Sequence, residues 1–193
     1  MKSQFWTAPN QLTLLRLVFI PLILVSIVDQ HWGWALALFL LAGASDGIDG
    51  LLARMLQQRT LLGEYLDPIA DKLLLSTLFV QLSVAGKIPW RVTVLVFTRD
   101  LFILVVAALL YAIANMRDFR PSIVGKLNTL AQIVTVFFTL VAQVHPATWI
   151  RYVRRGGLWA TIALTILSGA HYAARTSLRL RKGERRTAVR RPG

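Results

Sequence analysis

The chain has 193 residues, of which 55% are hydrophobic and 16% are charged, with a formal net charge of +13. So few charged side chains cannot cover the surface of a soluble domain of this length, and the composition favours a membrane protein. The absence of cysteine excludes disulfides, thiolate metal sites and cysteine nucleophiles. Much of the positive charge lies between Arg175 and Arg191 and in short loops, without an aromatic-studded groove. This arrangement indicates topology signals and lipid-headgroup contacts, and it argues against nucleic-acid binding.

Six long apolar stretches follow one another along the chain, and each is long enough to cross a bilayer as a helix. They cover residues 10–28, 33–57, 61–85, 92–114, 122–144 and 153–176. Turn-forming or helix-breaking residues separate them at 29–31, 86–89, 120–121 and 155–157. We expect an all-α integral membrane protein with six transmembrane helices. We expect one domain over residues 1–180 and a basic, disordered tail over residues 181–193.

The first stretch is predicted to be a retained span and not a cleaved signal, because no small-residue cleavage site follows it. An even number of spans places both termini on one side of the membrane. That side would collect more Lys and Arg than the other, including the whole tail, which predicts cytoplasmic termini. The loop around residues 57–60 would then also be cytoplasmic.

Four aspartates gather where the second and third stretches meet this predicted cytoplasmic surface. In the second stretch, helical spacing puts Asp46, Asp49, Gly50 and Ala53 on one face. Gly63, Asp67 and Asp71 share one face of the third. A short connection joins the two stretches, so we expect the two faces to oppose each other.

Carboxylates near hydrocarbon cost several kcal/mol each and also repel one another. Lys72 follows Asp71 directly and therefore points to a neighbouring face, so it does not solve the problem. Two divalent cations would neutralise the four carboxylates. Ligands that are all oxygen atoms suit Mg²⁺ or Mn²⁺ more than zinc. Paired metals typically clamp phosphates during in-line displacement, while a further carboxylate can deprotonate a hydroxyl. The residues thus predict phosphoryl-type transfer at a membrane surface.

A transporter with intramembrane aspartates is the alternative from another class. It predicts acidic residues at several depths and paired repeats with broken helices. Here the acidic residues cluster at one end and no repeat is evident.

The spacing of these residues resembles the signature of the CDP-alcohol phosphatidyltransferase family. The matching pattern is Asp46-x2-Asp49-Gly50-x2-Ala53-Arg54-x8-Gly63-x3-Asp67-x3-Asp71. The likeness extends to Pro9-Asn10-x-Leu12-Thr13-x2-Arg16-x4-Pro21 and to Gly125-Lys126-x-Asn128-Thr129-x2-Gln132. It therefore covers nearly the whole chain.

The resemblance implies the family's six-helix fold, a homodimer, and attack on the lipid-bearing phosphate of CDP-diacylglycerol with CMP as the leaving group. Asp46, Asp49 and Asp67 would bind the two divalent cations. Asp71 would be the base, with a possible contact to the second metal. The cytidine and pyrophosphate would contact a further set of residues: Asn10, Thr13, Gly50, Ala53, Arg54 and Thr60. A bacterial inner membrane is the expected location.

The acceptor alcohol is read from two positions. Phosphatidylglycerophosphate synthases usually have Arg-Glu in the fourth span with a second Arg eight residues after the first, and Gly-Lys-x-Lys-Thr in the fifth. This chain has Arg99-Asp100, but Ala107 and Asn128 stand where the added cations would fall. Less positive charge favours an acceptor with one phosphodiester charge, so we expect phosphatidylglycerol and cardiolipin synthesis. Glycerol 3-phosphate is the alternative acceptor. Arg99 and Lys126 are candidate phosphate contacts, although Arg99 could instead pair with Asp100.

Overall fold

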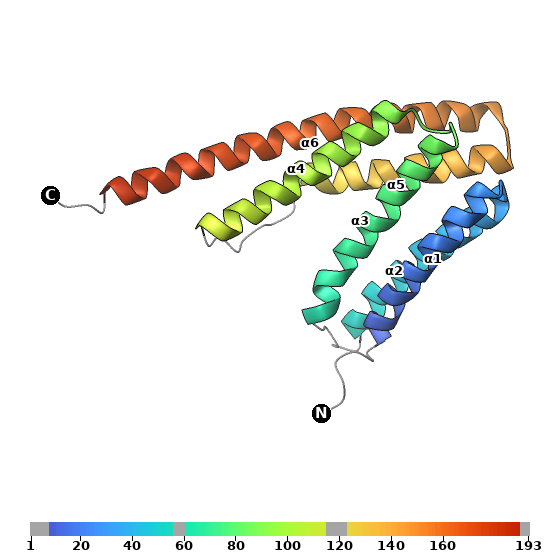
Figure 1. Cartoon of the computed structure of the whole chain (residues 1–193), viewed down its shortest axis with the longest axis horizontal. Helices are drawn as coiled ribbons and strands as arrows, with labels where there is room; N and C mark the ends of the chain where they lie inside the picture. Colours follow the sequence, from blue (N-terminus) through green and yellow to red (C-terminus); the bar gives the residue numbers. More distant parts are fainter. Residues whose placement is uncertain (1–7, 56–60, 115–122, 190–193) are drawn as a thin grey trace.

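A computed structural model of the chain describes residues 8–55, 61–114 and 123–189, and it describes side chains within residues 15–45, 70–106 and 123–173. The described residues form six α-helices and no β-strand, which agrees with the all-α prediction. The helices are α1 (Ala8–Val28), α2 (Trp32–Met55), α3 (Leu61–Val84), α4 (Trp90–Ala114), α5 (Ile123–Val144) and α6 (Thr148–Val189). In Figure 1, α1, α2 and α3 form one inclined group, while α5 and α6 run across its upper end and α4 lies along α6.

The first five helices follow the predicted stretches to within two residues at each end, apart from the predicted ends at 57 and 122, which lie outside the described residues. Helix α6 differs from the prediction at both of its ends. The expected break at Arg155-Gly156-Gly157 is wrong, since α6 passes through it and the chain turns at residues 145–147 instead. Pro146 explains this turn, because proline lacks the amide hydrogen that a helix interior needs.

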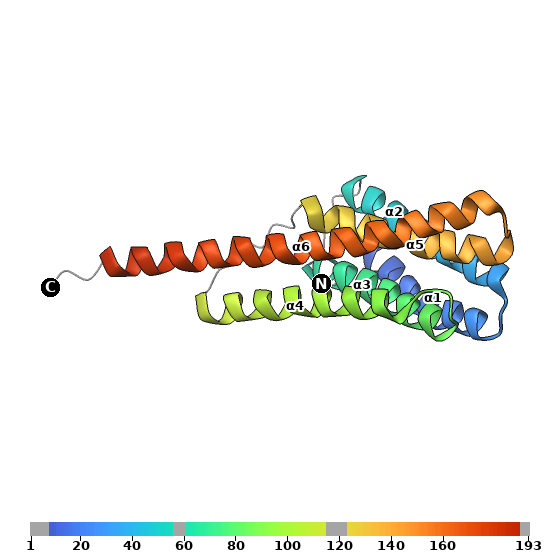
Figure 2. The ribbon, with the colours of Figure 1, turned by 90° about the horizontal axis from the view of Figure 1, so that it is seen from above.

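Helix α6 also continues to Val189, whereas a span ending at residue 176 and a disordered tail were predicted. Residues 177–189 are mostly good helix formers and contain no proline, so nothing in the sequence stops the helix there. The division into a domain and a tail at residue 180 stays a prediction, but residues 181–189 are helical. Figure 2 shows this helix projecting past the other five.

The turns after α1 and α3 use the same hydrogen-bond pattern. The amide of His31 donates to the carbonyl of Ser26 (2.8 Å), and that of Lys87 donates to Leu82 (2.8 Å). In each turn the preceding residue, Gln30 or Gly86, has a positive φ, of 59° and 69° respectively. This arrangement satisfies the last carbonyl groups of a helix and reverses the chain sharply.

The apolar core lies among α1, α2 and α3, with additions from α4 and α5. Ile23, Phe79, Leu78 and Leu82 are fully buried there. Among the described residues, α5 is the one helix long and apolar enough to cross a membrane. Shorter apolar segments occupy Leu15–Val28 and Trp32–Ser45.

The contact between α5 and α6 has a different composition. Seven buried polar residues lie on these two helices: Asn128, Gln132, Thr135 and Thr139 on α5, and Thr161, Thr165 and Ser168 on α6. Thr165 donates to the side-chain oxygen of Asn128 (2.9 Å), and the hydroxyls of Thr135 and Thr161 are 2.9 Å apart. A Cβ added to Gly157 would lie 3.0 Å from the hydroxyl oxygen of Thr135, so the two helices approach closely at that glycine. We refer to these seven residues and Gly157 as the polar seam.

Candidate active site

One end of the bundle brings together the segments that carry the predicted site. Figure 1 shows the start of α1, the end of α2 and the start of α3 at this end, and α1 packs against both α2 and α3. The backbone of residues 46–55 and 61–71 is helical, so the spacing used to assign shared faces to the aspartates applies.

The structure does not describe the side chains of most of the predicted site residues. These are Asn10, Thr13, Asp46, Asp49, Gly50, Ala53, Arg54 and Asp67; Thr60 lies outside the described residues altogether. Their convergence on a diphosphate therefore stays a prediction. Asp71, Arg99 and Lys126 are described.

Asp71 forms an ion pair with Arg16 of α1. The side chain of Arg16 is only 1% exposed, whereas that of Asp71 is 45% exposed. A buried guanidinium needs a charged or strongly polar partner, since an isolated buried charge is very unfavourable. Arg16 thus holds one oxygen of the predicted base, whose side chain remains partly exposed.

Arg16 belongs to the motif of the first predicted span, but the motif alone assigns no role to this residue. The available signal was an arginine at the start of an apolar stretch, which in a membrane helix calls for a partner. The sequence does not reveal that partner, because Asp71 is 55 residues away.

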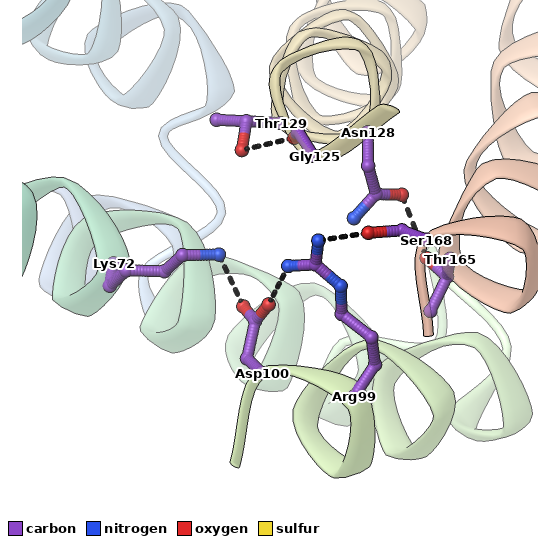
Figure 3. A network of polar contacts seen from close by, with 8 residues as sticks. All are labelled: Lys72, Arg99, Asp100, Gly125, Asn128, Thr129, Thr165 and Ser168. Carbon is purple, nitrogen blue, oxygen red and sulfur yellow. Dashed lines mark hydrogen bonds and ion pairs between the residues drawn. The ribbon is translucent and has the colours of Figure 1, made fainter. Parts of the chain in front are cut away.

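Lys72 points away from Asp71, as predicted from their adjacent positions. Its ammonium donates to Oδ2 of Asp100 on α4 (2.7 Å), and the guanidinium of Arg99 donates to Oδ1 of the same carboxylate (2.6 Å). Arg99 also donates to the hydroxyl of Ser168 on α6. Figure 3 shows these four residues, which we call the Asp100 cluster, between three helices. The pairing of Arg99 with Asp100, left open by the sequence, is present.

Asn128 of α5 lies beside this cluster in Figure 3, with its amide nitrogen on the side of the Arg99 guanidinium. That nitrogen is buried and has no hydrogen-bond partner among the described residues, and the same holds for both polar side-chain atoms of Gln132. Buried amides without partners are rare in folded proteins. Lys126, the other predicted phosphate contact, is exposed near the start of α5.

The residues present fit divalent cations by the chemistry of their donors. Asp46, Asp49, Asp67 and Asp71 offer only carboxylate oxygens, which are the ligands of hard cations. Among the described side chains, no three His, Asp or Glu residues come together. The side chains of Asp46, Asp49 and Asp67 are not among the described ones. The described member, Asp71, has an accessible carboxylate.

Comparison with known proteins gives the family. The family model of the CDP-alcohol phosphatidyltransferases matches residues 6–167. The human protein named cardiolipin synthase (CMP-forming) is 32% identical over 194 residues, covering 89% of this chain and 63% of that protein. A probable phosphatidylglycerophosphate synthase of Mycobacterium tuberculosis is 37% identical over 188 residues, covering 93% and 85%.

A putative cardiolipin synthase of Mycobacterium tuberculosis is 32% identical over 146 residues, covering 75% of this chain and 69% of that protein. The chain spans 63% of the length of the human relative. The matched segment contains every residue of the quoted motifs, from Pro9 to Gln132. The chain belongs to the CDP-alcohol phosphatidyltransferase family.

Proposed function

We propose that this protein is an integral membrane enzyme that transfers the phosphatidyl group of CDP-diacylglycerol to an alcohol. The observation that carries the proposal is the family match over residues 6–167, which includes the four aspartates at one end of the bundle. In the reaction, the alcohol oxygen forms a bond to the lipid-bearing phosphorus while the bond from that phosphorus to the CMP oxygen breaks. The alcohol proton passes to a base, and CMP leaves with the electron pair.

Asp71 is the proposed base. Its carboxylate is partly exposed, as proton transfer from a substrate hydroxyl requires, and Arg16 holds one of its oxygens. Asp46, Asp49 and Asp67 would hold two divalent cations, Mg²⁺ or Mn²⁺, with Asp71 as a fourth carboxylate ligand. When bound, these cations would offset the negative charge of the diphosphate and of departing CMP. Asn10, Thr13, Gly50, Ala53, Arg54 and Thr60 would line the site of the CDP-lipid.

The proposed setting is a bilayer crossed by all six helices. Many large apolar side chains face outward, including Val25 on α1, Leu104 on α4 and Trp159 on α6. Such surfaces suit lipid and are unusual for a soluble monomer. We further propose a homodimer in a bacterial inner membrane, with the termini and the site in the cytoplasm. The Lys and Arg residues of the C-terminal segment support this orientation.

Phosphatidylglycerol is the proposed acceptor, which would make the product cardiolipin. Two relatives named cardiolipin synthase and the absence of added cations at Ala107 and Asn128 support it. Glycerol 3-phosphate is the second candidate, because a relative named as a probable phosphatidylglycerophosphate synthase is 37% identical.

The test is release of CMP from CDP-diacylglycerol by the purified protein in proteoliposomes with Mg²⁺ or Mn²⁺. Phosphatidylglycerol, glycerol 3-phosphate, inositol phosphate and serine are offered separately, and the lipid formed is identified by mass spectrometry. We expect cardiolipin. Absence of CMP with every acceptor would contradict the enzyme proposal, and ion flux into the same vesicles would then favour a transporter.

Two variants test the residue roles. Asp71→Asn should lower turnover about 100-fold or more, the usual contribution of a general base. Asp46→Ala should abolish metal-dependent turnover while the thermal unfolding temperature without metal is retained. Asp29→Asn is the matched control, because Asp29 is an exposed carboxylate in the turn at the other end of α1. Normal turnover in Asp71→Asn would disprove the base assignment.

A further inference from the structure

The Asp100 cluster contains two cations and one anion. Asp100 uses one carboxylate oxygen for each cation, Oδ2 for Lys72 and Oδ1 for Arg99. The Arg99 and Asp100 side chains are only 10% and 15% exposed, whereas that of Lys72 is 41% exposed. Asp100 therefore holds the side chains of Lys72 and Arg99 in position, and its negative charge cancels one of their two positive charges.

One positive charge remains in the cluster after this pairing. A charge held in a mostly buried place is unfavourable unless an anion or strong acceptor accompanies it. The cluster also has N–H groups that make no hydrogen bond to the described residues. An arginine has five N–H groups and an ammonium three, but the described contacts of Arg99 use two and that of Lys72 uses one. The Nε atom of Arg99 is buried without a partner among the described residues.

A neutral polar group without a partner among the described residues lies next to this charge. The amide nitrogen of Asn128 faces the guanidinium side, and Gln132 lies one helical turn further along α5. An oxyanion flanked by hydroxyl groups would supply both kinds of partner that are missing, an anion for the charge and hydroxyls for the amides. The cluster is linked to the predicted reaction centre through Lys72, which directly follows the proposed base Asp71.

We propose that Asp100 is a specificity-determining positioning residue for the acceptor. By holding Lys72 and Arg99 and cancelling one charge, it leaves a subsite with one net positive charge, which matches a phosphate diester and disfavours a doubly charged phosphate monoester. This inference rests on the proposed function. A purely structural ion pair between α3 and α4 would stabilise the fold but would leave the choice of acceptor unchanged.

The experiment compares kcat/KM for phosphatidylglycerol with kcat/KM for glycerol 3-phosphate, at saturating CDP-diacylglycerol, in the wild type and in variants. Asp100→Asn keeps the shape but removes the charge, and it should lower the diester-to-monoester ratio about tenfold, which corresponds to about 1.4 kcal/mol. Asn128→Lys adds one charge while Asp100 stays, and it should shift the ratio in the same direction. Asp100→Glu keeps the charge and should retain the wild-type ratio. Asp29→Asn makes the same change in total charge far from the cluster and should leave the ratio unchanged.

An unchanged ratio in both Asp100→Asn and Asn128→Lys would overturn the proposal, even with normal CMP release. If Asp100→Asn does not fold, Asn128→Lys alone decides between the two outcomes. A second measurement separates this inference from the proposed function. Thermal stabilisation of the protein by dihexanoyl phosphatidylglycerol and by glycerol 3-phosphate reports the same preference without turnover. Suppose that the wild type releases no CMP but is stabilised more by the diester, and that Asp100→Asn lacks this preference. This result would refute the enzyme proposal and support the subsite. Equal stabilisation of the wild type by both compounds would refute the subsite.

Discussion

Two regions of this bundle hold their helices together by different means. The core of α1, α2 and α3 consists of interlocking apolar side chains such as Ile23, Phe79 and Leu82, all fully buried. The polar seam between α5 and α6 consists of five hydroxyl-bearing and two amide side chains, with hydrogen bonds between Thr135 and Thr161 and between Thr165 and Asn128, and with a close helix approach at Gly157. In a bilayer, lipid tails are as apolar as leucine, so apolar side chains join helices chiefly through the fit of their shapes. Hydrogen bonds and small residues add contacts that lipid cannot replace.

The largest expected effect is in the apolar core. Phe79→Ala removes a fully buried ring from the centre of the cluster and should lower the free energy of unfolding by about 3 kcal/mol, as large-to-small core changes do. The measurement is unfolding in mixed detergent micelles with increasing sodium dodecyl sulfate. Leu104→Ala is the control, because Leu104 is 68% exposed and should change stability little. Equal losses in the two variants would mean that burial inside the protein gives no advantage over contact with detergent.

The close approach in the polar seam can be tested with two adjacent glycines of α6. Alanine raises helix propensity equally at both positions. A Cβ at Gly156 would meet nothing within 4 Å, whereas one at Gly157 would press on Thr135. We expect Gly156→Ala to be stabilising by up to about 1 kcal/mol and Gly157→Ala to fall about 1 kcal/mol below it. Equal melting temperatures for the two variants would show that α5 and α6 can separate without cost.

The smallest expected effect is that of one hydrogen bond across the seam. A double-mutant cycle of Thr135→Val and Thr161→Val should give a coupling free energy of about 0.6 kcal/mol, the average for hydrogen bonds between membrane helices. Ser83→Ala with Thr93→Val repeats the cycle for a buried hydroxyl pair, 2.5 Å apart, at the edge of the apolar core. A coupling of zero at the first pair would leave the hydrogen bond from Thr165 to Asn128 and the close approach at Gly157 as the specific contacts of the seam.

The sequence predicted the course of α1 to α5 well because apolar runs and turn residues are local signals. It failed at α6 for a physical reason. Gly156 and Gly157 look like a break, but glycine also serves where helices pack closely, and a single sequence does not separate the two uses. Pro146 was the better boundary signal.

The candidate site was predictable where it depends on spacing along one helix and not where it depends on packing between helices. Spacing indicated that Lys72 and Asp71 face different ways, and their separate partners confirm it. The partners themselves, Arg16 for Asp71 and Asp100 for Lys72, come from other helices, and nothing local in the sequence identifies them. Helical spacing puts Asn128, Gln132, Thr135 and Thr139 on one face of α5, but only the structure shows that Thr161 and Thr165 of α6 lie against this face.

The length of α6 limits how the protein can sit in a bilayer. Its 42 residues span about 63 Å at a rise of 1.5 Å per residue. Even tilted by about 40°, such a rod covers about 48 Å along the membrane normal, more than the ~45 Å thickness of a bilayer with its headgroups. If α6 crosses the bilayer as proposed, one of its ends emerges into water, and by its sequence the arginine-rich C-terminal end is the one suited to do so. The helix would hold these charges at a fixed distance from the rest of the bundle. Their attraction to the negative surface potential of anionic lipids would then orient the whole bundle.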